Sequence, residues 1–373
     1  MLVFIYLFFF WRLGSMTAGL GPSEYTSRQN SQATKQIISR GINAPYYLMQ
    51  RGLVVLLNDG VLALRLASVI SGLVILVFLF LLLRSWFGQA VALFACLVFI
   101  STPWIVITAR TATANIMLLW PIVPLACFVL LSRSKQRAGL WWLMLTLTAI
   151  LSLYTPGLIW FLLAGILATG RTFLDASRRL NGAYIVAGIA LAILLVAPLA
   201  LALALEPSRL KQLALIPDNW QSGTDILKSI GWSAVSIFWS TKNSVDIGIG
   251  HLPVLNILQI ALFIFGFYAL SSRARNIIFS LAGLLLFAIL ISGINDNPHL
   301  LLFGLPAVAV FIAAGLRYLY IEWRRVFPLN PFAYALAISL IGVVVAAHLL
   351  YAGRYSLIAW PHTTETKATY VLK

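Results

Sequence analysis

Apolar residues recur in long runs along the whole chain, and short polar stretches separate the runs. The runs at 61–83 and 182–205 each carry at most one charged residue. A helix needs roughly 20 apolar residues to cross a hydrocarbon core of about 30 Å. In that core a helix also satisfies its own backbone hydrogen bonds. The pattern therefore predicts an all-α polytopic membrane protein.

About eleven transmembrane helices are predicted. Their approximate limits are 2–12, 61–83, 88–106, 113–132, 139–153, 157–170, 182–205, 253–271, 276–293, 299–316 and 331–352. The fifth and sixth are short and meet at "LYTPG", so one broken helix is an alternative. The first offers only ten apolar residues before Arg12, about 15 Å of helix, and a missing N-terminal piece is expected. We predict a single transmembrane domain over 1–352 and a short tail over 353–373.

Composition agrees with this class. Apolar residues make up 61% and charged residues 10% of the chain, against about 45–50% and about 25% in soluble domains. The net charge of +16 could indicate nucleic-acid binding, but the basic residues are dispersed between apolar runs. The two cysteines lie inside apolar runs, and the four histidines are too scattered to specify a metal. No metal or cofactor is predicted.

The basic residues predict an orientation. They fall in every second connection, at Arg84, Arg133, Lys135, Arg137, Arg171, Arg178, Arg179, Arg273, Arg275, Arg317, Arg324 and Arg325. Positively charged short loops are cytoplasmic. The N-terminus is then cytoplasmic, and the long loops 21–60 and 206–252 and the tail lie on the outer face.

The first outer loop is predicted to form two amphipathic surface helices. Ser23 is the expected N-cap of the first helix. Its polar face is expected to hold Glu24, Arg28, Ser31 and Lys35. The second helix starts at Pro45, with Tyr46 and Tyr47 as interfacial aromatics. Glu24 is either a catalytic base or a charge that stabilises a helix start.

The second outer loop contains "TDILKSIGWSAVSIFW", a further amphipathic helix. It either covers a cavity as a lid or lies in the interface through its tryptophans, and we favour the second interpretation. Arg65, Arg110, Asp296 and His299 lie where spans meet the outer boundary. Such groups face a cavity, pair with one another or reach lipid headgroups, and arginine suits a phosphate.

Four stretches carry a resemblance to a known family. They are "GLGPSEYTSRQ", the segment from "INAPYYLMQRG" to "ITARTATANIMLL", "LYTPGLIWFLL", and the pair "LPVLNILQIALFIFGFYAL" and "HLLLFGLPAVAVFIAAGL". In order and spacing they resemble the GT-C superfamily of polyprenyl-phosphate-dependent glycosyltransferases, such as protein O-mannosyltransferases and lipid A aminoarabinose transferases.

The resemblance implies an inverting transfer of a sugar from a polyprenyl-phosphate donor to an acceptor hydroxyl on a glycan, lipid or protein at the outer face. It makes Glu24 the general base. Arg65, Arg110 and His299 become candidates for the donor phosphate or headgroup. The supporting candidates are Arg28, Lys35, Asn115 and Asp296. Sugar, carrier and acceptor stay open.

Two departures from the family pattern keep other functions open. Ser23 stands where relatives have the aspartate of an Asp-Glu pair, and Ala114-Asn115 stands where many have an acid. These losses favour an inactive GT-C-like scaffold as one alternative. A lipid or solute transporter is the other, although "YTPG" has no partner in a second half of the chain, as transporter repeats would require.

Overall fold

The computed structural model describes residues 1–58, 60–134, 136–242, 244–271, 275–328 and 330–372. In these ranges the only strand-like pairing is an isolated antiparallel bridge between Leu20 and Leu372. The chain divides into two compact units. Unit 1 comprises Met1–Pro22, Leu83–Thr111 and Ser222–Lys373, and unit 2 comprises Ser23–Leu82 and Ala112–Gln221. The predicted all-α class is confirmed.

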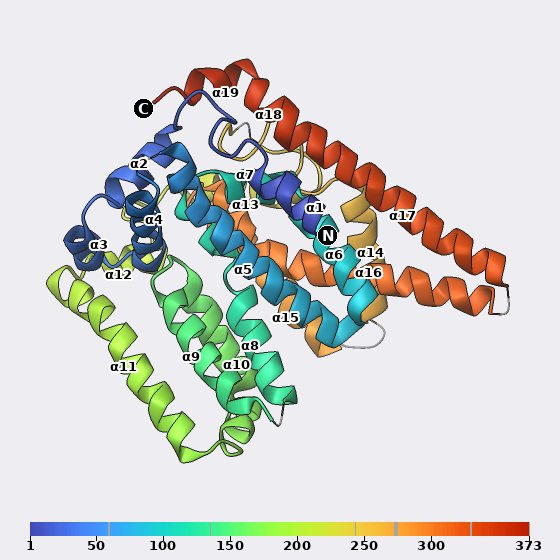
Figure 1. Cartoon of the computed structure of the whole chain (residues 1–373), viewed down its shortest axis with the longest axis horizontal. Coiled ribbons are helices and arrows are strands. Elements are labelled where there is room, and N and C mark those ends of the chain that lie inside the picture. Colours follow the sequence, from blue (N-terminus) through green and yellow to red (C-terminus); the bar gives the residue numbers. More distant parts are fainter. Residues whose placement is uncertain (59, 135, 243, 272–274, 329, 373) are drawn as a thin grey trace. The chain divides into compact units, whose positions relative to one another are not determined.

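The helices of unit 2 are drawn in blue to yellow-green in Figure 1. They are α2 (Pro22–Asn30), α3 (Thr34–Arg40), α4 (Ala44–Leu56), α5 (Val61–Phe87), η2 (Ala114–Leu119), α8 (Ile122–Arg133), α9 (Ala138–Leu153), α10 (Leu158–Ser177), α11 (Gly182–Leu205) and α12 (Arg209–Leu213). Helix α2 begins at the last residue of unit 1, and α5 runs on into unit 1.

Four helices of unit 2 form a bundle in which α9 contacts α8, α10 and α11. Ile166, Leu167, Ile193 and Leu194 are exposed on α10 and α11. Such apolar exposure is typical of a surface that contacts lipid or a partner. Helices α9 and α10 are separate and pack on each other, so the alternative of one broken helix is wrong.

The connections of unit 2 lie at two ends. Between α9 and α10, the Tyr154 carbonyl accepts from the Asn43 N–H at 2.7 Å, and the Gly157 N–H donates to the Leu213 carbonyl at 2.7 Å. This connection therefore lies beside the first long loop and the start of the second. Helix α10 has 20 residues, about 30 Å at 1.5 Å each. Its far end meets α11, and the α8–α9 connection lies at that end too.

The basic residues of unit 2 follow this division. Arg133, Arg137, Arg178 and Arg179 are exposed at the α8–α9 and α10–α11 connections, away from the long loops. The alternation on which the predicted orientation rests is thus present, and the cytoplasmic side stays a prediction. Two further basic residues used for it, Lys135 and Arg273, lie outside the described residues.

Unit 1 contains the remaining helices (Figure 1). They are α1 (Leu2–Ile5), η1 (Tyr6–Phe10), α6 (Gln89–Ile100), α7 (Pro103–Arg110), α13 (Gly223–Phe238), α14 (Ile257–Ser271), α15 (Arg275–Ile294), η3 (Pro298–Gly304), α16 (Leu305–Val326), α17 (Pro331–Gly353), η4 (Arg354–Ala359), α18 (Trp360–His362) and α19 (Thr364–Thr369).

Helix α16 is the centre of unit 1, and every residue from Leu305 to Leu316 is buried. It contacts α14 along much of its length. The two backbones approach closely because both helices carry a glycine at the crossing. A Cβ atom on Gly266 would lie 1.8 Å from the Phe311 carbonyl oxygen, and one on Gly315 would lie 2.1 Å from the Leu262 carbonyl oxygen. Small residues allow such contacts between membrane helices.

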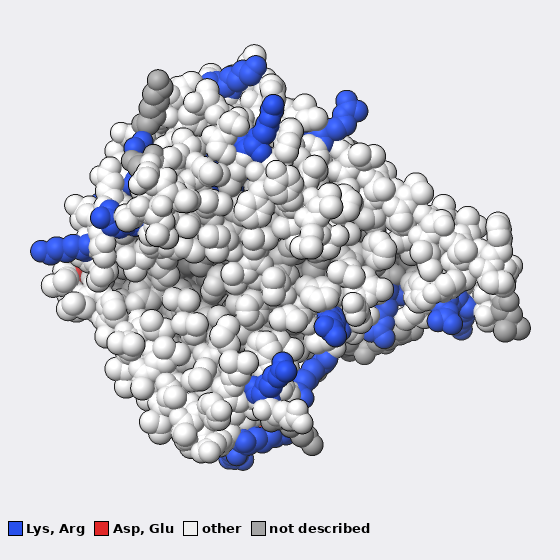
Figure 2. All heavy atoms as spheres, viewed as in Figure 1, with Lys and Arg blue, Asp and Glu red and all other residues white. Residues whose placement is uncertain are grey.

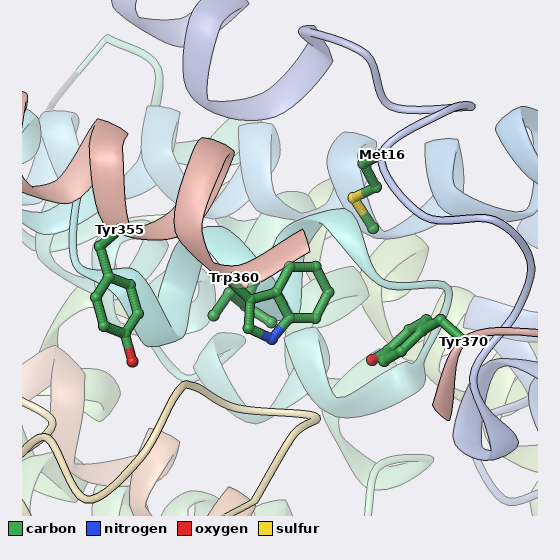
Figure 3. Packing of buried hydrophobic residues seen from close by; sticks show 5 residues of the cluster. Met16, Tyr355, Trp360 and Tyr370 are labelled. Carbon is green, nitrogen blue, oxygen red and sulfur yellow. The ribbon is translucent and has the colours of Figure 1, made fainter. Parts of the chain in front are cut away.

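The segment after α17 is folded onto unit 1. Figure 3 shows Trp360 lying between Tyr355, Met16 and Tyr370, and all four side chains are buried. The Trp360 Nε1–H donates to the Val245 carbonyl at 2.8 Å. The bridge between Leu20 and Leu372 then joins the segment to the residues before α2. The predicted tail is therefore packed helical structure.

The predicted count of eleven spans is not confirmed. Among the described residues, seven helices are long and apolar enough to cross a membrane, or eight if one bent pair is a single span. Helices α9 and α14 are shorter apolar helices. Residues 2–12, predicted as a span, form only the short α1 and η1. Helix α16 also continues past 316 to Val326, through Arg317.

The predicted span at 88–106 is bent, because α6 and α7 meet at 68°. The hydroxyls of Ser101 and Thr102 donate to carbonyls of the preceding turn, at 2.7 Å to Leu97 and 3.2 Å to Val98. Such bonds bend helices. Pro103 follows and has no backbone N–H to continue the helix. Together these residues produce the bend.

The surface agrees with the composition. On the face drawn in Figure 2 uncharged atoms dominate and acidic side chains are nearly absent, whereas Lys and Arg are frequent. The predicted amphipathic stretch of the second long loop is helical, as α13, and its Leu227 and Trp232 are exposed. Whether α13 acts as a lid stays a prediction.

Candidate functional site

Glu24 lies in the first turn of α2 and is buried, with 1% of its surface exposed. Its carboxylate pairs with Arg65 of α5. The Arg65 Nε–H donates to Oε1 at 2.8 Å and the Nη2–H donates to Oε2 at 2.9 Å. Oε1 also accepts from the Ala112 N–H at 2.8 Å. This bidentate geometry is the strong form of a charge-assisted pair.

The pair lies entirely within unit 2, and neither side chain is at the surface. Arg65 is fully buried on α5. A buried charge is tolerated when it is paired and hydrogen-bonded, and both conditions hold here. Glu24 also lies in the first turn of α2, where an anion is favourable. The choice between a catalytic base and a helix-start charge therefore stays open.

A buried polar network surrounds the pair. The Ser27 hydroxyl donates to Gln50 Oε1 at 3.2 Å, and Gln50 Nε2 donates to the Leu64 carbonyl at 3.2 Å. The hydroxyls of Tyr46 and Ser68 lie 2.8 Å apart. Burial raises the pKa of Tyr46 above its usual value, so the phenol keeps its proton. The prediction that Tyr46 is an interfacial aromatic is wrong.

This network was missed in the sequence, although a signal was present. Glu24 and Ser27, Tyr46 and Gln50, and Arg65 and Ser68 are each spaced by three or four residues. At that spacing the two side chains share one helix face. Three helices thus turn a polar face inward. Their mutual contact depends on tertiary packing, which the spacing does not reveal.

The predicted details of the first loop need correction. Helix α2 begins at Pro22, so Ser23 is inside the helix and not its N-cap. The chain forms three helices there, because α2 ends at Asn30 and Gly41, with φ of +74°, separates α3 from α4. Lys35 is exposed on α3, whereas Arg28 is half-buried on α2. The expected continuous polar face is therefore interrupted.

Arg110, a further predicted site residue, belongs to unit 1. It ends α7 and is buried, and its Nη2–H donates to the Trp11 carbonyl at 2.5 Å. The bend between α6 and α7 sets its position at the end of a short helix. Asn115 lies in unit 2, half-buried in η2, three residues after the Ala112 N–H that contacts Glu24.

Asp296 and His299 also belong to unit 1. The Asp296 carboxylate accepts from Lys242 Nζ at 2.7 Å and from the Ser229 hydroxyl at 3.1 Å. The Lys242 hydrogen bond lowers the pKa of Asp296, so this acid stays ionised as the pH falls below its usual range. His299 is half-buried in η3. The contacts of Asp296 are therefore those of an ion pair that joins loops of unit 1.

Comparisons with known proteins agree with this architecture. The family model for dolichyl-phosphate-mannose-protein mannosyltransferase matches residues 44–201. The fold is similar to that of ArnT from Cupriavidus metallidurans bound to undecaprenyl phosphate, with a TM-score of 0.63 and 16% identity over 99% of this chain and 76% of that one. The chain therefore shares a polytopic helical membrane fold with this protein.

A second solved structure supports the same fold. It is the archaeal oligosaccharyltransferase AglB from Archaeoglobus fulgidus, in complex with an inhibitory peptide and a dolichol-phosphate. Its TM-score is 0.58, with 12% identity over 97% of this chain and 55% of that one. No curated protein matches the chain by sequence. The resemblance to GT-C glycosyltransferases that the sequence predicted is confirmed.

Proposed function

We propose that the chain is a membrane glycosyltransferase that moves a sugar from a polyprenyl-phosphate donor to an acceptor hydroxyl at the outer face. The GT-C fold supports this proposal, and two proteins of similar fold were solved with a polyprenyl phosphate. The observation that carries the site is the buried carboxylate of Glu24, a residue of the first long loop, which pairs with Arg65 of α5.

The reaction is a single displacement. The acceptor oxygen attacks the anomeric carbon, and the bond from that carbon to the phosphate oxygen breaks. The hydroxyl proton passes to the Glu24 carboxylate, and the polyprenyl phosphate leaves with the bonding electron pair. Attack opposite to the leaving group inverts the anomeric centre. A positioned base of this kind contributes about 10²–10⁴-fold.

Arg65 has a different role in this proposal from the phosphate contact expected from the resemblance. Its Nε and Nη2 donate to Glu24 and the side chain is fully buried. This favours a positioning residue that orients the Glu24 carboxylate. Arg110 and His299, both in unit 1, stay predicted candidates for the donor phosphate. Of the two, the Arg110 guanidinium is the group whose positive charge would stabilise the charge that develops on a phosphate.

Transfer from labelled polyprenyl-phosphate sugars by the purified full chain tests the base. Glu24→Gln removes the proton acceptor, so we expect transfer to fall by about 100-fold or more. Glu24→Asp keeps the charge with a shorter reach and should retain part of the activity. Gel filtration normalises each rate to folded protein. Wild-type transfer by folded Glu24→Gln would rule out this base.

A second candidate is a GT-C-like scaffold without transferase activity. It is favoured because both Glu24 oxygens already accept hydrogen bonds and because Ser23 replaces the aspartate of the relatives. Under this alternative the wild type transfers no sugar from any donor, and Ser23→Asp gains transfer. Sugar transfer by the wild type would exclude this alternative.

A further inference from the structure

A polar cavity of about 450 Å³ lies within unit 2, apart from the Glu24–Arg65 pair. It is lined by Asn30 of α2, Arg40 of α3, Tyr47 of α4, Ile42, and Glu206 and Arg209 at the end of α11 and in α12. Helices α3 and α11 contact each other here, as the upper end of α11 in Figure 1 shows. Small-molecule sites are typically about 300–1,000 Å³.

The charged side chains of the cavity are held in place. Arg209 pairs with Glu206 and also donates to the Ser39 carbonyl of α3. Arg40 donates to the Asn30 side-chain oxygen, and the Asn30 amide donates to the Tyr47 hydroxyl at 3.4 Å. These contacts fix two guanidinium groups on one cavity from two separate loops.

The balance of charge identifies the ligand class. Two guanidinium groups and one carboxylate line the cavity, so one positive charge is left over. Glu206 compensates Arg209, whereas Arg40 has an uncharged partner, Asn30. Guanidinium groups bind phosphate oxygens in a bidentate manner. Tyr47, Asn30 and Glu206 add groups that can hydrogen-bond the hydroxyls of a polar headgroup.

We propose that this cavity binds a phosphate group through Arg40 and Arg209. The site is separate from the proposed catalysis and requires no sugar donor. Of the lining residues named, Tyr47 alone lies within residues 44–201, the part that matches the family model. The other five come from segments on either side of it. The site is therefore built by residues of the two long loops.

Binding is measured by the thermal midpoint of the full chain in phosphatidylcholine nanodiscs, without any sugar. One arm adds inorganic phosphate, and the other replaces part of the lipid with phosphatidylglycerol. A ligand of the folded state raises the midpoint. If inorganic phosphate raises the midpoint, a soluble phosphate group is a sufficient ligand. If only phosphatidylglycerol raises the midpoint, the ligand is a lipid headgroup.

Arg40→Gln should weaken the apparent affinity about tenfold, which corresponds to the loss of one charge-assisted contact. Lys211→Gln is the matched control. Lys211 is exposed on α12, so this substitution removes the same charge outside the cavity. Arg40→Lys should keep part of the affinity, and gel filtration checks folding. No rise in either arm, or equal losses in Arg40→Gln and Lys211→Gln, would overturn the proposal.

Discussion

At the residue scale, the Glu24–Arg65 pair has consequences for stability as well as for catalysis. Both groups are buried, so removing one leaves an uncompensated charge. For buried pairs this costs about 3–5 kcal/mol, whereas replacing both by apolar groups is often neutral. We therefore expect Glu24→Gln to lower the thermal midpoint in detergent and Glu24→Gln/Arg65→Met to recover most of the loss.

Asp175→Asn is the control for that comparison. Asp175 and Arg178 form an exposed pair at 4.0 Å, and such pairs contribute little. Its midpoint should equal that of the wild type. If Glu24→Gln has the wild-type midpoint too, the pair does not anchor α2 to α5, and its two charges would serve only the reaction.

The sequence predicted both members of this pair as site residues but not their contact. They are 41 residues apart, and each was identified by its charge in an apolar setting. Pairing depends on how α2 packs against α5, which periodicity does not encode. The Ala112 N–H was not predictable either, because a backbone donor carries no sequence signal until the path of the chain between α7 and η2 is known.

At the element scale, the α14–α16 crossing depends on Gly266 and Gly315. An added Cβ at Gly315 would lie 2.1 Å from a backbone oxygen, so the helices must separate to admit it. Overpacking of this kind typically costs about 1–3 kcal/mol. We expect Gly315→Ala to lower the thermal midpoint, as measured by fluorescence-detected gel filtration after heating.

Gly283→Ala is the matched control for that substitution. Gly283 lies inside α15, and a Cβ there meets nothing within 4 Å. Alanine is favoured over glycine in helices by up to about 1 kcal/mol, so the midpoint should stay or rise. A fall as large as that of Gly315→Ala would show that the crossing is not responsible.

Long apolar elements were predicted well from the sequence, and short or irregular ones were not. The predicted spans 61–83 and 182–205 correspond closely to α5 and α11, because sustained hydropathy dominates the signal. The bend at Ser101–Pro103 and the separate η3 before α16 were missed. Hydroxyl side chains that hydrogen-bond the backbone, and prolines that interrupt a helix, cause these irregularities within an apolar run. An average of hydropathy does not detect either effect.

At the scale of the whole molecule, the predicted orientation is the largest claim that the sequence supports. The exposed Arg133, Arg137, Arg178 and Arg179 lie at one end of unit 2 and the long-loop residues at the other. The fold thus agrees with the charge alternation. Which end faces the cytoplasm is set when the chain is inserted into the membrane, and the end whose short loops are rich in Lys and Arg is the cytoplasmic one.

Cysteine labelling tests this orientation. Cys96 and Cys127 are buried and are replaced by alanine to give a background without thiols. Gln136→Cys then reports the α8–α9 connection, and Ser208→Cys reports the second long loop. Positive-inside insertion predicts that a membrane-impermeant maleimide labels Ser208→Cys in intact cells and Gln136→Cys only after permeabilisation. The reverse pattern would place Glu24 on the cytoplasmic side and remove the outer-face acceptor from the proposed reaction.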